Sequence, residues 1–263
     1  MGMTRWVTRL IYANAAVYLI TPMAMPRLMP YFWLVPAGVP YRPWTIVTYM
    51  FLHAGLWHIL FNMLGLFFFG PRLEQRLGGK HFLGLYFASG ITGAVLSIVN
   101  ALVNPIVSPF VPIVGASGAV FGVLLGFAMY WPREQIYIWG VLPVQARVLV
   151  GVMTALALFG GFGSTQGGVA HFAHLGGFLG GYVYIKWTEH NSPAKKFKRK
   201  VEAPARGPGS EKSDLKRWEN IRRDEMHPVN RDELDRVIEK IKNSGIGSLT
   251  PDERAFLDRF AQR

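Results

Sequence analysis

Residues 115–126 have the sequence GASGAVFGVLLG, in which glycines recur every four residues at Gly118, Gly122 and Gly126. Glycines at this spacing lie on one face of a helix and allow a second helix backbone to approach closely. Residues 171–181, HFAHLGGFLGG, contain two more glycine pairs at the same spacing. The two stretches therefore predict two neighbouring helices that pack against each other through glycine.

The composition around these stretches is that of a membrane protein. Of 263 residues, 51% are apolar and 17% are charged, against about 25% charged in soluble domains. Residues 1–185 carry nine Lys or Arg and only two Asp or Glu, and form six apolar segments at approximately 7–22, 45–70, 81–103, 115–131, 141–163 and 169–187. Most approach the ~20 residues that a helix needs to cross a bilayer. The sequence predicts an all-α membrane protein with six transmembrane helices in residues 1–188.

Basic residues fall in alternate loops of this six-helix pattern, and the opposite loops hold only Arg27 and Arg42. Loops rich in Lys and Arg stay in the cytoplasm, so we expect both termini inside the cell and the protein in a bacterial inner membrane. The first segment, preceded by Arg5 and Arg9, also resembles a secretory signal, but further apolar segments follow it rather than a soluble domain. The outer loop 23–44 is rich in proline and aromatic residues, and it is either an interfacial loop or a structured rim around an active site.

Ser117 lies at the start of the fourth segment, where a helix N-terminus exposes unpaired N–H groups and a positive dipole end. Such a position suits an oxyanion that forms beside a serine. The fourth and sixth segments both start outside, so Ser117 and His174 are expected at similar depth. Residues 1–185 contain no Asp, so serine catalysis would need a Ser–His dyad rather than a triad. Phe121, one turn after Ser117, could face the imidazole.

Four histidines lie near the outer ends of the segments, and a metal site built from them is the main alternative to serine chemistry; they are His53, His58, His171 and His174. The chain has no Cys, no HExxH motif and no carboxylate near that end of any segment, so a metalloprotease would lack its general base. The sequence therefore favours serine chemistry without a metal or another cofactor. His171, one turn before His174, stays open as a competing base.

Four motifs in order are similar to those of the rhomboid intramembrane serine proteases: HAGLWHILFN at 53–62, EQRLG at 74–78, GASG at 115–118 and AHLGG at 173–177. The resemblance covers nearly all of residues 1–188. It implies a rhomboid-like bundle that cleaves transmembrane segments of membrane proteins, with Ser117 as nucleophile and His174 as base. It also implies an oxyanion site made by His58, Asn62 and the Ser117 N–H. A rhomboid-like protein that binds membrane proteins without cleaving them is the alternative.

The resemblance assigns supporting roles to other residues of this site. Phe121 stands where the family often has a Tyr that stacks on the catalytic imidazole, and His53 matches a histidine that holds a loop and helix in place. Glycines line the site or allow close helix packing at Gly115, Gly118, Gly122 and Gly177. The Glu74–Arg76 motif would be structural. The chain departs from the family at Thr45, which replaces the Arg of a Trp–Arg pair in the outer loop.

The remaining residues predict a cytoplasmic extension. Residues 189–213 form a basic, Pro- and Gly-containing linker, which either anchors the last helix or binds anionic lipid through Lys195, Lys196, Lys198, Arg199 and Lys200; nucleic acid is not an expected partner. Residues 214–263 predict a small helical hairpin. Its first helix would start at an Asn230–Glu233 capping box and end at Gly245, and its second would start at Thr250–Pro251. With so few apolar residues, this hairpin is expected to dock on another helix, on an unknown partner or on a second copy.

Overall fold

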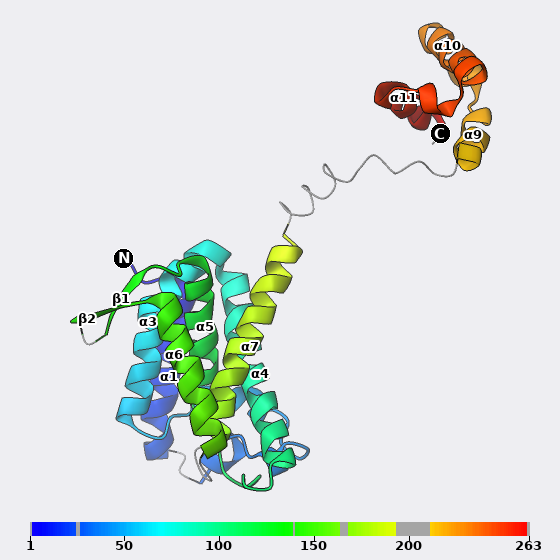
Figure 1. Cartoon of the computed structure of the whole chain (residues 1–263). Coiled ribbons are helices and arrows are strands. Elements are labelled where there is room, and N and C mark those ends of the chain that lie inside the picture. The colour runs from blue at the N-terminus through cyan, green and yellow to red at the C-terminus, as the bar shows by residue number, and fades with distance from the viewer. Residues whose placement is uncertain (1, 25–26, 139, 164–167, 193–210, 262–263) are drawn as a thin grey trace. The chain divides into compact units, whose positions relative to one another are not determined.

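The computed structural model describes residues 2–24, 27–138, 140–163, 168–192 and 211–261. Within these residues the chain is mostly helical (Figure 1). It divides into two compact units, Met1–Ser192 and Pro193–Arg263. Each unit has its own cluster of buried apolar side chains, so each is stabilised by a separate core.

The first unit is a bundle of long helices (Figure 1): α1 (Arg5–Ala24), α3 (Leu56–Leu77), α4 (Gly79–Val103), α5 (Ser117–Tyr130), α6 (Ala146–Gly163) and α7 (Gly168–His190). Helix α4 packs most extensively against α7 and α5, and these three form the centre of the bundle. Among the described residues, α3 and α4 are long and apolar enough, by length and composition, to cross a membrane. The helices coincide with the apolar segments of the sequence, apart from two interruptions.

The first interruption lies within residues 45–70, which do not form one helix. A short helix α2 (Thr45–Thr48) and a 3-10 turn η3 (Tyr49–Phe51) come first, and α3 begins only at Leu56. Tyr49 and Met50 of the turn are buried, and the Tyr49 hydroxyl donates a 2.7 Å hydrogen bond to the Gly90 carbonyl of α4. The chain therefore enters the core before α3 starts, and His53 lies in the connection rather than in a helix.

The second interruption is a β-hairpin between α5 and α6. Strand β1 (Gln135–Ile138) pairs in antiparallel fashion with β2 (Leu142–Gln145). The fifth segment was expected to be helical from about residue 141, but α6 starts at Ala146. The β-branched residues Ile136, Ile138 and Val144 favour a strand here.

The outer loop is structured by backbone and side-chain hydrogen bonds. It contains the 3-10 turns η1 (Met29–Tyr31) and η2 (Pro36–Gly38). The buried Leu34 and Ile113 exchange backbone hydrogen bonds of 3.1 and 2.7 Å. The Arg42 guanidinium donates to the Pro30 carbonyl at 2.7 Å, so Arg42 holds this loop although Thr45 stands at the position where the resemblance leads us to expect Arg. The loop is thus attached to the segment that leads into α5.

Two residues of the EQRLG motif contact the ends of other helices: Glu74 contacts the start of α1, and Arg76 contacts the end of α5. The Glu74 carboxylate accepts hydrogen bonds from the Thr4 hydroxyl and from the N–H groups of Trp6 and Val7. It therefore caps the N-terminus of α1 from α3, where a negative charge is stabilised by the helix dipole. The Arg76 guanidinium lies 4.8 Å from the ring centroid of Tyr130 at the end of α5. These contacts agree with a structural role for the motif.

The second unit has three helices among its described residues, α9 (Glu211–Glu219), α10 (Pro228–Ser244) and α11 (Pro251–Ala261). The expected two-helix hairpin therefore omitted α9, which brings Trp218 into the core. The Trp218 Nε1–H donates to Asp258 of α11 at 3.0 Å. The core consists of Trp218, Ile221, Met226, Leu234, Val237, Ile246, Leu249 and Leu257.

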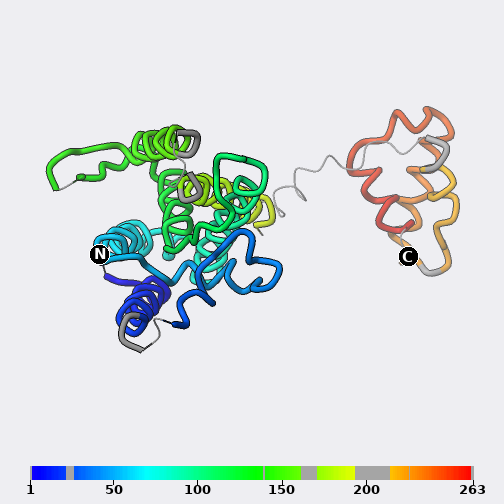
Figure 2. Tube along the Cα trace, turned by 90° about the horizontal axis from the view of Figure 1, so that it is seen from below, coloured from blue at the N-terminus to red at the C-terminus, as the bar shows by residue number. Residues whose placement is uncertain are grey.

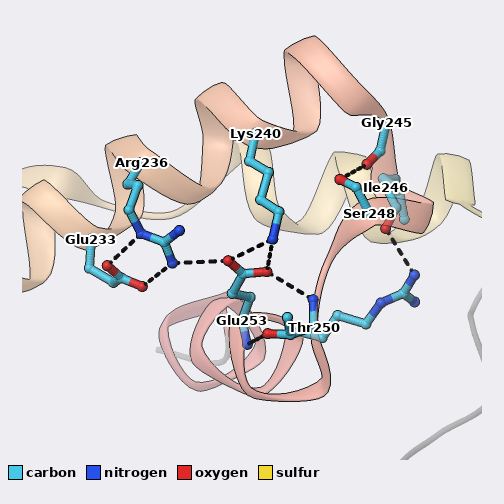
Figure 3. A network of polar contacts seen from close by, with 9 residues as sticks. Glu233, Arg236, Lys240, Gly245, Ile246, Ser248, Thr250 and Glu253 are labelled. Atoms are coloured by element: carbon cyan, nitrogen blue, oxygen red, sulfur yellow. Dashed lines mark hydrogen bonds and ion pairs between the residues drawn. The ribbon is translucent and has the colours of Figure 1, made fainter.

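Of the helix boundaries predicted in this unit, one start was wrong. Helix α10 begins at Pro228 after His227, so the predicted Asn230–Glu233 box does not form, because proline at the first helical position already sets the helical φ. The Thr250–Glu253 box does form: Glu253 N–H donates to the Thr250 hydroxyl at 3.2 Å, and Thr250 N–H donates to the Glu253 carboxylate at 2.8 Å. Figure 3 shows this box joined to Lys240 and Arg236 of α10.

Candidate active site

Ser117 is the first residue of α5, and the backbone before it is sharply turned. Gly115 has φ of +123°, a conformation that side chains other than glycine rarely adopt. Its N–H donates to the Tyr49 carbonyl at 2.9 Å, which holds the turn against the buried segment before α3. Ser117 is therefore positioned at a helix N-terminus, where unpaired N–H groups and the dipole favour negative charge.

His174 of α7 lies beside this hydroxyl. Its Nε2 is 2.9 Å from the Ser117 Oγ, which is a hydrogen-bonding distance. The Phe121 ring stacks on the imidazole with centroids 4.2 Å apart and planes inclined by 12°. The stacked ring limits rotation of the imidazole, so Nε2 is held toward Ser117.

Glycines bring the two helices close enough for this contact. A Cβ atom added at Gly177 of α7 would lie 2.0 Å from the Gly118 carbonyl oxygen of α5. At Gly122 of α5, an added Cβ would lie 3.0 Å from the Gly177 carbonyl oxygen of α7, and it would also meet the Ser89 hydroxyl of α4. Side chains at these positions would separate the helices, so the glycine spacing predicted from the sequence sets the distance between Ser117 and His174.

His58 of α3 lies against Gly115, because a Cβ on that glycine would be 2.6 Å from the His58 Nε2. The Ala54 N–H donates to the His58 Nδ1 at 3.4 Å. With Nδ1 acting as acceptor, the proton of the neutral ring is assigned to Nε2. The Nε2–H donor therefore lies beside Gly115, next to the turn that precedes Ser117.

Asn62 is buried one turn after His58, and its Nδ2 donates to the His58 carbonyl at 2.8 Å. One of its two amide hydrogens is thus used within α3, and the other is free to serve a ligand. The structure places Asn62 beside His58 without bringing it into hydrogen-bonding contact with Ser117.

The two other histidines pack differently. The buried His53 ring meets His58 edge to face, with centroids 5.1 Å apart. The His171 ring lies perpendicular to His174, and its Nε2 would be 2.4 Å from a Cβ on Gly160 of α6. His171 therefore packs on α6 whereas His174 faces Ser117. For the described part of the chain, no three His, Cys, Asp or Glu side chains come together as a metal site.

Two supports of this site were not identified from the sequence. The Tyr49 carbonyl holds the Gly115 turn, and the Ala54 N–H sets the protonated nitrogen of His58. Both act through backbone atoms, which every residue possesses. For the second contact, the sequence offers one indication: Ala54 lies four residues before His58, within reach of its ring.

Two protein families match the chain, the Rhomboid domain over residues 40–190 and a family of unknown function (DUF6576) over residues 225–263. Rhomboid-like protease 3 of Toxoplasma gondii is 34% identical over 154 residues, which are 57% of this chain and 53% of that protein. Rhomboid protein 1, mitochondrial, of Saccharomyces cerevisiae is 32% identical over 163 residues, 62% of this chain and 46% of that protein. Rhomboid protease GluP of Bacillus subtilis is 33% identical over 139 residues, 53% of this chain and 25% of that protein.

The chain thus spans about half the length of the first two relatives and a quarter of the third. The Rhomboid domain covers more than half of the chain and contains Ser117, His174 and their supporting helices. The chain belongs to the rhomboid family of integral membrane proteins.

Proposed function

We propose that this protein is an intramembrane serine endopeptidase, with Ser117 as nucleophile and His174 as general base. The observation that carries the proposal is the 2.9 Å contact between Ser117 Oγ and His174 Nε2 at the N-terminus of α5. Membership of the rhomboid family agrees with it. The substrates are transmembrane segments of other membrane proteins.

The reaction passes through an acyl-enzyme. Ser117 Oγ attacks the scissile carbonyl carbon while its proton moves to His174 Nε2. The imidazolium then donates this proton to the leaving amine, and an ester remains on Ser117. Water adds to the ester and gives a proton to His174, which returns it to Ser117 Oγ as the carboxyl product leaves. With no Asp in residues 1–185, the stacked Phe121 orients the imidazole in place of a carboxylate.

The oxyanion would be stabilised by three donors: the Ser117 N–H, the His58 Nε2–H and the second Asn62 amide hydrogen. The assigned His58 protonation and the remaining Asn62 donor support these roles. Removing one such donor typically lowers the rate by a factor on the order of 10²–10³.

We propose six transmembrane helices with both termini in the cytoplasm, in a bacterial inner membrane. The alternation of basic loops supports this orientation. With 14 residues, α5 rises about 21 Å, less than the ~30 Å of the hydrocarbon core. If its cytoplasmic end lies at the interface, Ser117 lies below the outer surface, and water reaches it from that side.

The test uses purified protein reconstituted with a model transmembrane substrate. Ser117→Ala and His174→Ala should abolish cleavage, whereas His171→Ala, which removes the same kind of side chain one turn away, should retain most of it. Wild-type-like cleavage by either dyad variant would reject the mechanism.

A fluorophosphonate probe separates the protease from a rhomboid-like protein that only binds its partners. The probe reacts with an activated serine, so it should label the wild type and not Ser117→Ala. A wild type that binds the substrate but is neither labelled nor active would support the binding protein instead.

The C-terminal parts have proposed partners of their own. The five basic residues at 195–200, outside the described residues, would contact anionic lipid headgroups. The helices of the second unit would dock on a partner protein or a second copy, since their core is small. A fragment of residues 211–263 that is a stable, folded monomer in sedimentation and circular dichroism would contradict this docking.

A further inference from the structure

Strands β1 and β2 of the hairpin stand away from the helices of the first unit (Figures 1 and 2). Its register pairs Ile136 with Val144 and Ile138 with Leu142. No motif of the proposed protease reaction lies in it. An isolated two-stranded hairpin is marginally stable in water, so this one needs an additional surface against which to pack.

The two faces of the hairpin differ in polarity. Side chains alternate between faces along a strand, so one face carries Ile136, Ile138, Leu142 and Val144, and the other carries Gln135, Tyr137, Pro143 and Gln145. Near the bundle, Ile136 packs on a cluster that includes Phe127 and Ala146. Toward the turn, Leu142 is 59% and Val141 80% exposed. The aliphatic face is thus packed against the bundle at Ile136 and exposed near the turn.

Helix α6, which follows the hairpin, carries an exposed apolar stripe on a side other than that of Ala146 and Val150, where Ile136 packs. The stripe consists of Val148, Val152, Leu156 and Phe159, spaced so that they share one side of the helix. In a membrane-embedded bundle such a stripe faces lipid. This part of the first unit thus has two exposed apolar surfaces, the stripe on α6 and the outer end of the hairpin at Val141 and Leu142.

We propose that the hairpin lies in the cytoplasmic leaflet, with its aliphatic face among the upper acyl chains and Arg133 and Arg147 at the level of anionic headgroups. Both arginines are exposed at the base of the hairpin. The nearby Glu134 is neutralised by Arg72, at 3.0 Å. The base thus carries net positive charge, which anionic lipid attracts.

Pro143 argues against addition of another strand at the edge of β2. It cannot donate a hydrogen bond to Tyr137, its partner in the register, so this pair is of the non-hydrogen-bonded kind, whose polar backbone groups point outward. The open edge of β2 therefore lacks a donor at its centre, a feature that discourages edge-to-edge addition. Contact with lipid does not require backbone hydrogen-bond donors along a strand edge.

The inference rests on the topology proposed above, which places this end of the bundle in the cytoplasm. The hairpin links α5, which starts with Ser117, to α6. An anchored hairpin would hold the cytoplasmic end of α5 at the interface and so set the depth of the serine.

The chain contains no cysteine, so single nitroxide labels can be attached without removing native thiols. Leu142→Cys reports on the aliphatic face, Val141→Cys on a turn position with no packing role, and Tyr137→Cys, exposed on the opposite face beside Pro143, is the matched control. In liposomes containing anionic lipid, labels at 142 and 141 should collide severalfold more with oxygen than with a water-soluble nickel chelate, and the label at 137 should show the reverse. Equal nickel accessibility at all three sites would overturn the proposal.

Two further outcomes would also contradict it. Spin–spin broadening that grows with protein density would show that a second copy covers the face. Reaction of Arg133→Cys with an impermeant maleimide from the outer side would reject the leaflet assignment. None of these measurements depends on cleavage, and all can be repeated in Ser117→Ala. Failure of the proposed protease function is therefore distinguishable from failure of the lipid contact.

Discussion

At the scale of single residues, Gly115 combines a backbone of φ +123° with contact to the His58 ring. Gly115→Ala would strain the backbone by about 1–3 kcal/mol and place a Cβ 2.6 Å from the ring nitrogen. The ring must move, and its donor would leave the proposed oxyanion site. We expect kcat/KM to fall by a factor on the order of 10²–10³, measured with a reconstituted transmembrane substrate.

Gly78 provides the matched control for this change. It also has positive φ, at +78°, but an added Cβ would meet nothing within 4 Å. Gly78→Ala should lower the melting temperature by a similar amount and leave kcat/KM almost unchanged. Equal losses of activity in both variants would mean that backbone strain, and not the position of His58, is responsible.

At the scale of helices, the contact of α5 with α7 depends on Gly177. Gly177→Ala would drive a Cβ into the Gly118 carbonyl, and overpacking of this kind costs about 1–3 kcal/mol. If the helices separate by ~1 Å, activity should fall about 10²-fold because the serine and imidazole lose their alignment. Thermal unfolding and cleavage rates measure the two effects.

Gly151 of α6 is the control for this helix contact, because an added Cβ there meets no atom within 4 Å. Gly151→Ala should leave both stability and cleavage near their wild-type values. A Gly177→Ala protein with wild-type stability and rate would show that the glycine contact does not set the dyad distance.

At the scale of the whole molecule, the two units have separate cores, so a change in one should not unfold the other. Hydrogen bonds from Lys240, from the Thr250 N–H and from Arg236 hold the pKa of Glu253 at about 2, below its ordinary 4.5. Because the folded-state pKa is lowered, the stability that this carboxylate contributes is present above about pH 5 and is lost as pH falls toward about 2.

Hydrogen–deuterium exchange of the full chain, corrected for intrinsic rates, should show residues 228–261 opening more as pH falls from 5 to 2, with α5 and α7 unchanged. Glu253→Gln should open the same residues at neutral pH and remove most of this pH dependence. Glu239→Gln, at an exposed position of α10, should behave like the wild type. A pH dependence that survives Glu253→Gln would assign it to another group.

Much of the fold and site could be predicted from the sequence, because helix periodicity and membrane-length apolar segments are local properties. The helices coincide with the predicted segments, and Ser117 and His174 lie in contact as the depth argument required; their catalytic roles stay a prediction. The glycine rows in residues 115–126 and 171–181 also predicted the α5–α7 contact.

The tertiary structure alone determined where the helices predicted from apolar periodicity are interrupted or joined by further elements. The break at Tyr49–Phe51, the anchoring by Arg42 and the added helix α9 depend on contacts between residues distant in sequence. The Ala54 N–H that orients His58 and the Asn62 amide that donates to the His58 carbonyl join residues only four apart, but apolar periodicity does not predict them. Apolar periodicity specifies which face of a segment is buried, whereas backbone hydrogen bonds and packing across the bundle select where each element stops and where each donor points.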